Sequence, residues 1–223
     1  MSNQSNLWVF GDSFSVPFKR IEKECPYVHY KGYCPKIYSE LLSKKLGYNL
    51  TDMSMGGCSN YSMFHTFINC LDKIQPNDVL IFGWTQLIRF RVATKKNNFY
   101  DTIIAVVEHM KDMFDVNVDT LHDMTINRNE NSIYFTELSD YIKLINFYFK
   151  NNKIIHWTWV EPSNTFLLDD KQYEKKYYDL LEPYKKYVSI KEETNYDIDD
   201  FHYGEIAHLE LSNDLYKKIK NII

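Results

Sequence analysis

Short apolar runs alternate with longer amphipathic stretches along the chain. The runs at 7–10 and 79–82 are apolar without a break, which is typical of parallel strands buried on both faces. The same pattern, read with turn residues, predicts further strands at 49–54, 153–160 and 187–190. Apolar positions at helical spacing predict helices at 35–46, 60–74, 102–114, 134–150, 173–181 and 204–222.

Strands that alternate with helices predict an α/β protein with a parallel sheet covered on both faces. We expect a three-layer α/β/α, flavodoxin-like arrangement of about five strands. The 223 residues suit a single domain, 1–223, with an Asn/Asp-rich insertion around 92–132 and a loop at 14–34.

Three glycine-containing segments directly follow predicted strands. They are Gly-Asp-Ser at 11–13, Gly-Gly at 56–57 and Gly-Trp-Thr at 83–85. In open parallel sheets, sites lie at the carboxyl ends of the strands. We therefore expect these segments to meet at one edge of the sheet.

Composition excludes several classes of function. The net charge is −4 and the isoelectric point about 6.0, so no basic surface points to nucleic acid. No apolar run is long enough for a membrane helix, and the polar start of the chain lacks a signal-peptide pattern. We expect a cytoplasmic protein with four free cysteines and no membrane partner.

The residues at 11–15, Gly-Asp-Ser-Phe-Ser, together with the C-terminal segment, resemble the SGNH (GDSL-like) hydrolase family. The segment Asp199-Asp200-Phe201-His202, followed by a predicted helix, is similar to that family's last sequence block. Gly57 and Gly83 occupy the places of the glycines in its second and third blocks. The resemblance covers the whole chain in the family's order.

This resemblance implies a catalytic triad. Ser13 would attack an acyl carbonyl, His202 would accept its proton, and Asp199 would orient His202. The Asp-x-x-His spacing of the family favours Asp199, with Asp200 as the competing candidate.

The resemblance also implies an oxyanion hole made by the amides of Ser13 and Gly57 and by an asparagine side chain of the third block. This chain has Thr85 in place of that asparagine, followed by Gln86. Asn60, in the second block, is a further candidate donor, with a helix N-cap as its alternative role.

Each feature also has a purely structural interpretation. Ser13 fits a turn, Gly56-Gly57 a tight turn and His208 the core. Arg89 fits a surface charge or a contact with an anionic substrate. The segment from His202 to His208 lacks the H-E-x-x-H spacing, so neither zinc nor another cofactor is expected.

The activity expected from these features is hydrolysis of an acyl ester, most simply a carbohydrate O-acetyl or short-chain ester. The partner is then a small-molecule or carbohydrate ester. Acyl transfer is an alternative, and so is a non-catalytic carbohydrate-binding or virion-structural role. The last is motivated by the altered third block, the aromatic richness and a resemblance to phage-encoded members of the family.

Overall fold

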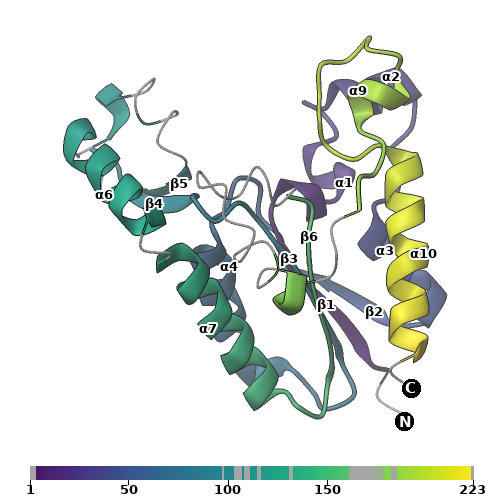
Figure 1. The fold of residues 1–223 in the computed structure, drawn as a ribbon. Helices are drawn as coiled ribbons and strands as arrows, with labels where there is room; N and C mark the ends of the chain where they lie inside the picture. The colour runs from purple at the N-terminus through teal and green to yellow at the C-terminus, as the bar shows by residue number, and fades with distance from the viewer. Residues whose placement is uncertain are drawn as a thin grey trace.

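The protein is built on a four-stranded, wholly parallel sheet. The computed structural model describes residues 4–96, 98–102, 107, 111–114, 117–130, 133–160, 175, 178–181 and 185–221. The strands are β1 (Asn6–Gly11), β2 (Asn49–Asp52), β3 (Val79–Trp84) and β6 (Lys153–Thr158), in the order β2-β1-β3-β6 (Figure 1). β1 and β3 are therefore the central pair, and each carries an unbroken apolar run of the sequence.

The central strands are apolar on both sides because both faces of the sheet are covered. Trp8 and Phe10 belong to one core, which is shared with α4 (Asn60–Ile68) and α7 (Ile133–Tyr148). Leu7 and Val9 belong to a second core, shared with α3 (Tyr38–Leu46) and α10 (Glu205–Asn221). This alternation follows from the two-residue repeat of a strand. The expected α/β architecture with helices on both faces is confirmed.

The strand predicted at 187–190 is wrong. Ser189 makes one isolated antiparallel bridge with Tyr203, and its side chain caps α9 (Ile190–Glu193) by accepting from the Glu192 amide. Ser189 and Glu192 form a capping box, which marks the start of a helix rather than a strand.

Other predicted boundaries shift. Residues 14–34, expected as loop, contain a 3₁₀ turn η1 (Ser13–Ser15) and the short helices α1 (Phe18–Ile21) and α2 (Pro26–Lys31). The helix predicted at 60–74 ends at Ile68, and a 3₁₀ turn η2 (Leu71–Lys73) follows. The helix predicted at 102–114 begins in a strand, at Thr102, and residues 111–113 form a 3₁₀ turn η3. Its other residues lie largely outside the described residues. The same holds for most of the helix predicted at 173–181.

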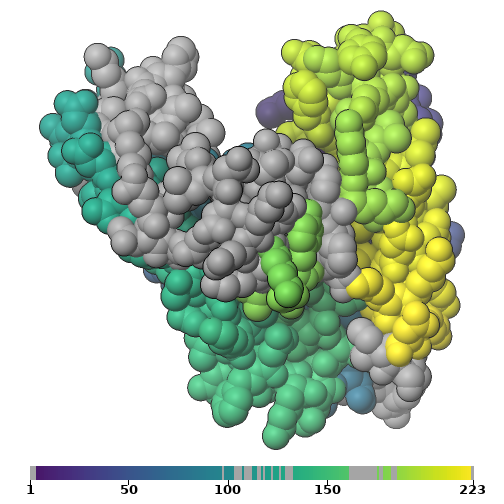
Figure 2. All heavy atoms as spheres, in the orientation of Figure 1, coloured from purple at the N-terminus to yellow at the C-terminus, as the bar shows by residue number. Residues whose placement is uncertain are grey.

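Two lobes rise beyond the carboxyl ends of the strands (Figure 1). One contains the antiparallel hairpin β4 (Phe90–Ala93) and β5 (Phe99–Thr102) together with α6 (Val118–Glu130). The other contains α1, α2 and α9, packed around their own small apolar cluster. Figure 2 shows the surface hollowed between the α6 side and the α9 side. None of the helices described here is both long and apolar enough to cross a bilayer.

Candidate active site

The Gly-Asp-Ser turn begins where β1 ends. Gly11 pairs with Gly83 of β3, and a Cβ atom at Gly11 would lie only 2.3 Å from the Ser15 hydroxyl. Only glycine fits such an approach. Asp12 then caps η1 by accepting from the Phe14 amide at 3.1 Å. The turn is thus fixed by packing below it and by a cap beside it.

Ser13, His202 and Asp200 form a connected hydrogen-bonded chain. Ser13 Oγ lies 2.8 Å from His202 Nε2, and His202 Nδ1 lies 2.6 Å from Asp200 Oδ1. Because a carboxylate accepts, Nδ1 carries the proton and Nε2 is free to accept from the serine. The hydrogen bond from His202 lowers the pKa of Asp200 despite its partial burial, which keeps this carboxyl ionised.

The prediction that Asp199 orients His202 is corrected by this geometry. Asp199 has a side chain that is 79% exposed and accepts from Lys191 Nζ at 2.6 Å. Asp200 instead accepts from both the backbone amide of His202, at 2.9 Å, and its ring. An aspartate side chain that accepts from the amide two residues on closes an Asx turn, and here this turn also places the Asp200 carboxylate against the His202 ring.

The histidine loop is held by the first turn of α9. The Ile190 amide donates to the His202 carbonyl at 2.7 Å, and the Lys191 amide donates to the Asp200 carbonyl at 2.8 Å. A Cβ atom at Gly204 would meet Glu193 Oε2, at the end of α9, at 2.2 Å, so the loop also packs closely against this helix there. The His202 loop is therefore held by several contacts with α9.

Two backbone amides near Ser13 are available to an oxyanion. Within the described part of the chain, neither the Ser13 amide nor the Gly57 amide makes a hydrogen bond. Gly57 has φ +75°, a left-handed conformation that suits glycine. Its loop is tied to the nucleophile turn, because the Met55 amide donates to the Gly11 carbonyl at 2.9 Å. The two candidate amides thus lie on neighbouring, linked loops.

The three side chains predicted as possible oxyanion donors, Asn60, Thr85 and Gln86, make different contacts. Asn60 is buried and uses both ends of its amide on the Thr85 backbone, accepting from the nitrogen at 2.9 Å and donating to the oxygen at 3.2 Å. It is not the helix cap, because Ser59 holds that position in α4. The Thr85 hydroxyl is buried beside Asp12 and helps to lower the pKa of that carboxyl. Gln86 lines a pocket instead. Asn60 thus joins the start of α4 to the residue that follows β3.

Asp12 is a buried carboxyl that the sequence analysis did not single out. It has no exposed surface, accepts from Trp159 Nε1 at 2.8 Å and lies 3.8 Å from the Arg89 guanidinium. Burial raises its pKa, and the surrounding donors and the Arg89 charge oppose that rise. Asp12 therefore ties the nucleophile turn to the end of β6 and to the loop after β3. In the sequence, the only sign of this role is that Asp12 lies between Gly11 and Ser13, directly after an apolar run.

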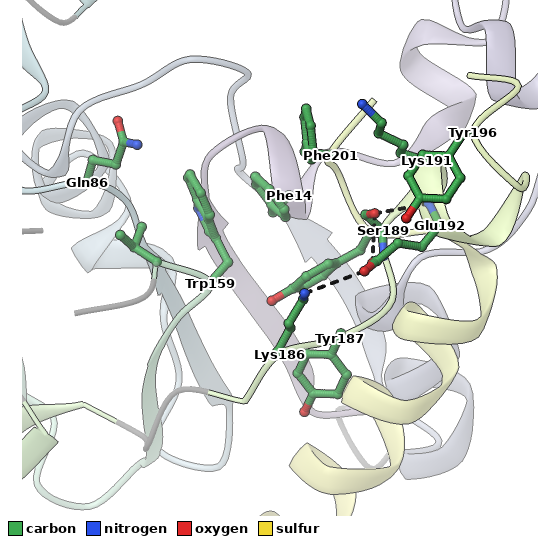
Figure 3. Close-up of a pocket in the computed structure, with 12 residues that line it drawn as sticks. Phe14, Gln86, Trp159, Lys186, Tyr187, Ser189, Lys191, Glu192, Tyr196 and Phe201 are labelled. Carbon is green, nitrogen blue, oxygen red and sulfur yellow. Dashed lines mark hydrogen bonds and ion pairs between the residues drawn. The ribbon is translucent and has the colours of Figure 1, made fainter. Parts of the chain in front are cut away.

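An aromatic pocket lies next to the Gly-Asp-Ser turn, and Figure 3 shows the side chains that line it. Its volume is about 470 Å³. Phe14 stacks on Trp159 with ring centroids 4.0 Å apart, and its centroid lies 4.6 Å from that of the His202 imidazole. Tyr187 and Tyr203 continue the wall toward α9, where Lys186 and Glu192 lie 3.5 Å apart. We refer to this cavity, lined by Phe14, Trp159, Tyr187 and Tyr203, as the aromatic pocket.

His208 has the structural role expected of it. It is buried, and its ring packs against Phe18, Tyr38 and Tyr203. Burial lowers its pKa to about 3, so the ring stays neutral. Within the described residues, no three His, Cys, Asp or Glu side chains are grouped as metal ligands would be.

Comparison with known proteins adds no family assignment. No protein-family model matches this chain, and no curated protein matches it.

Proposed function

We propose that this protein is a serine hydrolase of the SGNH type that cleaves an acyl ester through Ser13, His202 and Asp200. The observation that carries the proposal is the unbroken chain of contacts, 2.8 Å from Ser13 Oγ to His202 Nε2 and 2.6 Å from His202 Nδ1 to Asp200. These residues come from opposite ends of the sequence. A serine, a histidine and a carboxylate in this order and geometry are what acyl transfer requires.

The order of the parts around the sheet supports the family within this proposal. The strand order β2-β1-β3-β6 puts the Gly-Asp-Ser turn after a central strand, with Gly57 after its neighbour β2. His202 stands just before the last helix, α10. This is the arrangement that the sequence resemblance leads one to expect.

In the proposed reaction, Ser13 Oγ forms a bond to the acyl carbon while its proton passes to His202 Nε2. Negative charge develops on the carbonyl oxygen, where the amides of Ser13 and Gly57 donate to it. His202 then gives the proton to the leaving alcohol oxygen as the ester bond breaks, leaving an acyl-serine. Water attacks this acyl group by the same route in reverse and releases the acid. Asp200 remains a carboxylate and stabilises the imidazolium.

The surroundings support a short-chain ester on a sugar-sized alcohol. The side chains of His202 and Asp200 are 43% and 31% exposed, so the reacting groups are open to a bulky substrate. The aromatic pocket offers flat ring faces beside them, and such faces bury the apolar side of a sugar ring. Carbohydrate O-acetyl esters fit both features.

Labelling with a fluorophosphonate probe tests the proposal directly. Wild-type protein is expected to label covalently, and Ser13→Ala is expected to lose both the label and the hydrolysis of p-nitrophenyl acetate and acetylated sugars. Ser43→Ala, which removes a serine hydroxyl from α3, is the matched control. Equal labelling of folded Ser13→Ala and wild type would refute the assignment.

A further inference from the structure

The few arginines of this chain are concentrated in one cavity. The sequence has four: Arg20, Arg89, Arg91 and Arg128. The last three line a second pocket of about 400 Å³, formed by α4, the β4–β5 hairpin, α6 and α7. Arg20 is engaged elsewhere, with the Asp52 carbonyl. We call this cavity the arginine pocket.

Ion pairing leaves much of the donor capacity of these side chains unused. Each guanidinium has five N–H donors. Within the described part of the chain, Arg91 uses Nε on Asp101, Arg128 uses Nη2 on Glu137, and Arg89 uses Nη1 on the Cys58 carbonyl. Among the described residues, the other nitrogens of Arg89 and Arg91 make no further hydrogen bond, and Arg128 has the Tyr134 hydroxyl as one more partner. Their side chains are 17–34% exposed, so solvent screens them only partly.

Aromatic rings fix two of the guanidinium groups in place. Arg128 lies 4.7 Å from the centroid of the Tyr134 ring. Arg91 lies 5.4 Å from that of Tyr61 and 5.8 Å from that of Phe99. Such contacts orient a planar cation before any ligand arrives, which lowers the entropy cost of binding.

The pocket is connected to the loops around Ser13. The Arg89 guanidinium lies 3.8 Å from Asp12, the neighbour of the nucleophile. Asp101, the partner of Arg91, also accepts from the Ser59 amide at 3.0 Å, two residues after Gly57. Asn60, which clamps Thr85, lines the pocket itself. A ligand in this cavity therefore lies against residues that are bonded to the loops around Ser13.

We propose that the arginine pocket binds an oxyanion, a carboxylate or phosphate, carried on a sugar-sized ligand. The fork geometry of guanidinium matches the paired oxygens of both groups. The placement beside the nucleophile turn makes this ligand part of the ester substrate, and that assignment rests on the proposed hydrolase function. The enzyme would then prefer acylated acidic sugars over neutral ones.

Binding is tested without turnover in the Ser13→Ala protein. Calorimetric titration uses three probes of similar size: glucuronate, glucose 6-phosphate and neutral glucose. We expect saturable binding of at least one anionic sugar, weakened by added salt, and weaker binding of glucose. The two anionic probes distinguish a carboxylate site from a phosphate site. No saturable binding of either, or binding equal to that of glucose, would overturn the proposal.

A pair of charge-matched substitutions locates the site. Arg128→Gln, in the Ser13→Ala background, is expected to weaken binding of the anionic sugar by about 10- to 100-fold. Lys143→Gln removes the same charge from an exposed position on α7 and is expected to leave binding unchanged. Arg128→Lys keeps the charge without the fork and should fall between them. Circular dichroism confirms that each variant is folded.

The outcomes separate this proposal from the hydrolase proposal. Loss of anion binding in Arg128→Gln, combined with no probe labelling of Ser13 in the wild type, would keep the pocket and refute the hydrolase. Labelling of Ser13 with equal losses in Arg128→Gln and Lys143→Gln would keep the hydrolase and refute the pocket.

Discussion

Two aspartates and two histidines near this end of the sheet lie in opposite surroundings. Asp200 and His202 are partly open to solvent and contact each other at 2.6 Å. Asp12 and His208 are buried, and each is enclosed by aromatic rings or by donors from the fold. In the proposed reaction, His202 changes its charge while Asp200 stays ionised. The second pair cannot change its charge without a large cost in stability.

The difference teaches that residue type alone does not identify the working groups. Burial drives the pKa of Asp12 up and that of His208 down, so both buried groups are pushed toward their neutral forms. The hydrogen bond to His202 drives the pKa of Asp200 down instead. Exposure and pairing, rather than position in a motif, separate the reacting pair from the supporting pair.

The largest expected effect comes from exchanging the two histidines for alanine. His202→Ala should lower kcat by roughly 10³-fold or more, because triad members act together, with little change in melting temperature. His208→Ala should leave kcat near wild type while lowering stability by on the order of 2 kcal/mol. Ester hydrolysis and urea unfolding measure the two effects. An inactive but stable His208→Ala protein would show that His208, and not His202, is needed for the reaction.

Neighbouring aspartates provide the next test. Asp200→Asn should lower kcat by about 10⁴-fold, since the amide no longer fixes the imidazole tautomer. Asp199→Asn should be nearly silent because its side chain points to Lys191. The same esterase assay applies to both. Equal losses at the two positions would mean that the loop, rather than the Asp200 contact, sets activity.

The pH dependence of the rate sharpens the role of the exposed pair. The proton of Ser13 is accepted only by a neutral imidazole, so kcat/KM should rise between about pH 5 and 8. The lowered pKa of Asp200 keeps that carboxylate charged across this whole range. A single rising limb is therefore expected in a pH–rate profile on p-nitrophenyl acetate, and a flat profile would argue against His202 as the base.

Trp159 joins the exposed and buried pairs, and its indole nitrogen can be removed selectively. Trp159→Phe keeps a ring against Phe14 but deletes the donor to Asp12, which should cost about 1–3 kcal/mol of stability. The cost should shrink in the Asp12→Asn background, where the carboxyl that accepts from the indole is absent. Urea denaturation of the four proteins in this cycle measures the coupling. Additive losses would show that the contact contributes nothing.

The smallest expected effect is the acid sensitivity caused by buried neutral histidines. Burial lowers the pKa of both His156 and His208 to about 3, well below the ordinary value of about 6.5. The stability each provides is complete above pH 6.5 and is lost as the pH falls toward 3. At pH 5 this loss is up to about 2 kcal/mol per residue. His156→Gln should weaken the dependence of unfolding on pH, whereas His65→Gln, at an exposed position, should not.

The sequence predicted the parts of the fold that burial dictates. β1 and β3 were predicted correctly because both of their faces are covered, which leaves an unbroken apolar run. The helix at 204–222 was also predicted closely, and α10 spans Glu205–Asn221. The segment 187–190 failed because a capping serine and one bridging residue imitate a strand when only residue types are visible.

Within the candidate site, Ser13 and His202 are in contact, as their proposed roles require, while their supporting contacts did not follow from the sequence. Asp200 replaced Asp199 because the orienting contact depends on the turn that its side chain closes. Asn60 spends its amide on Thr85, a contact between loops 25 residues apart. The arginine pocket forms only when β4, β5, α6 and α7 come together, which brings Arg89, Arg91 and Arg128 side by side. Local sequence patterns do not predict contacts of this kind between distant segments.

The contact between Ser13 and His202 spans 189 positions of the chain. A ribosome makes the serine early and the histidine late, so a growing chain carries its proposed nucleophile without a base. In the proposed hydrolase, the serine would become reactive only when the last helix has docked and the histidine loop has bonded to α9. Reactivity of Ser13 toward a covalent probe would therefore report, in a single reading, that folding has run from one end of the protein to the other.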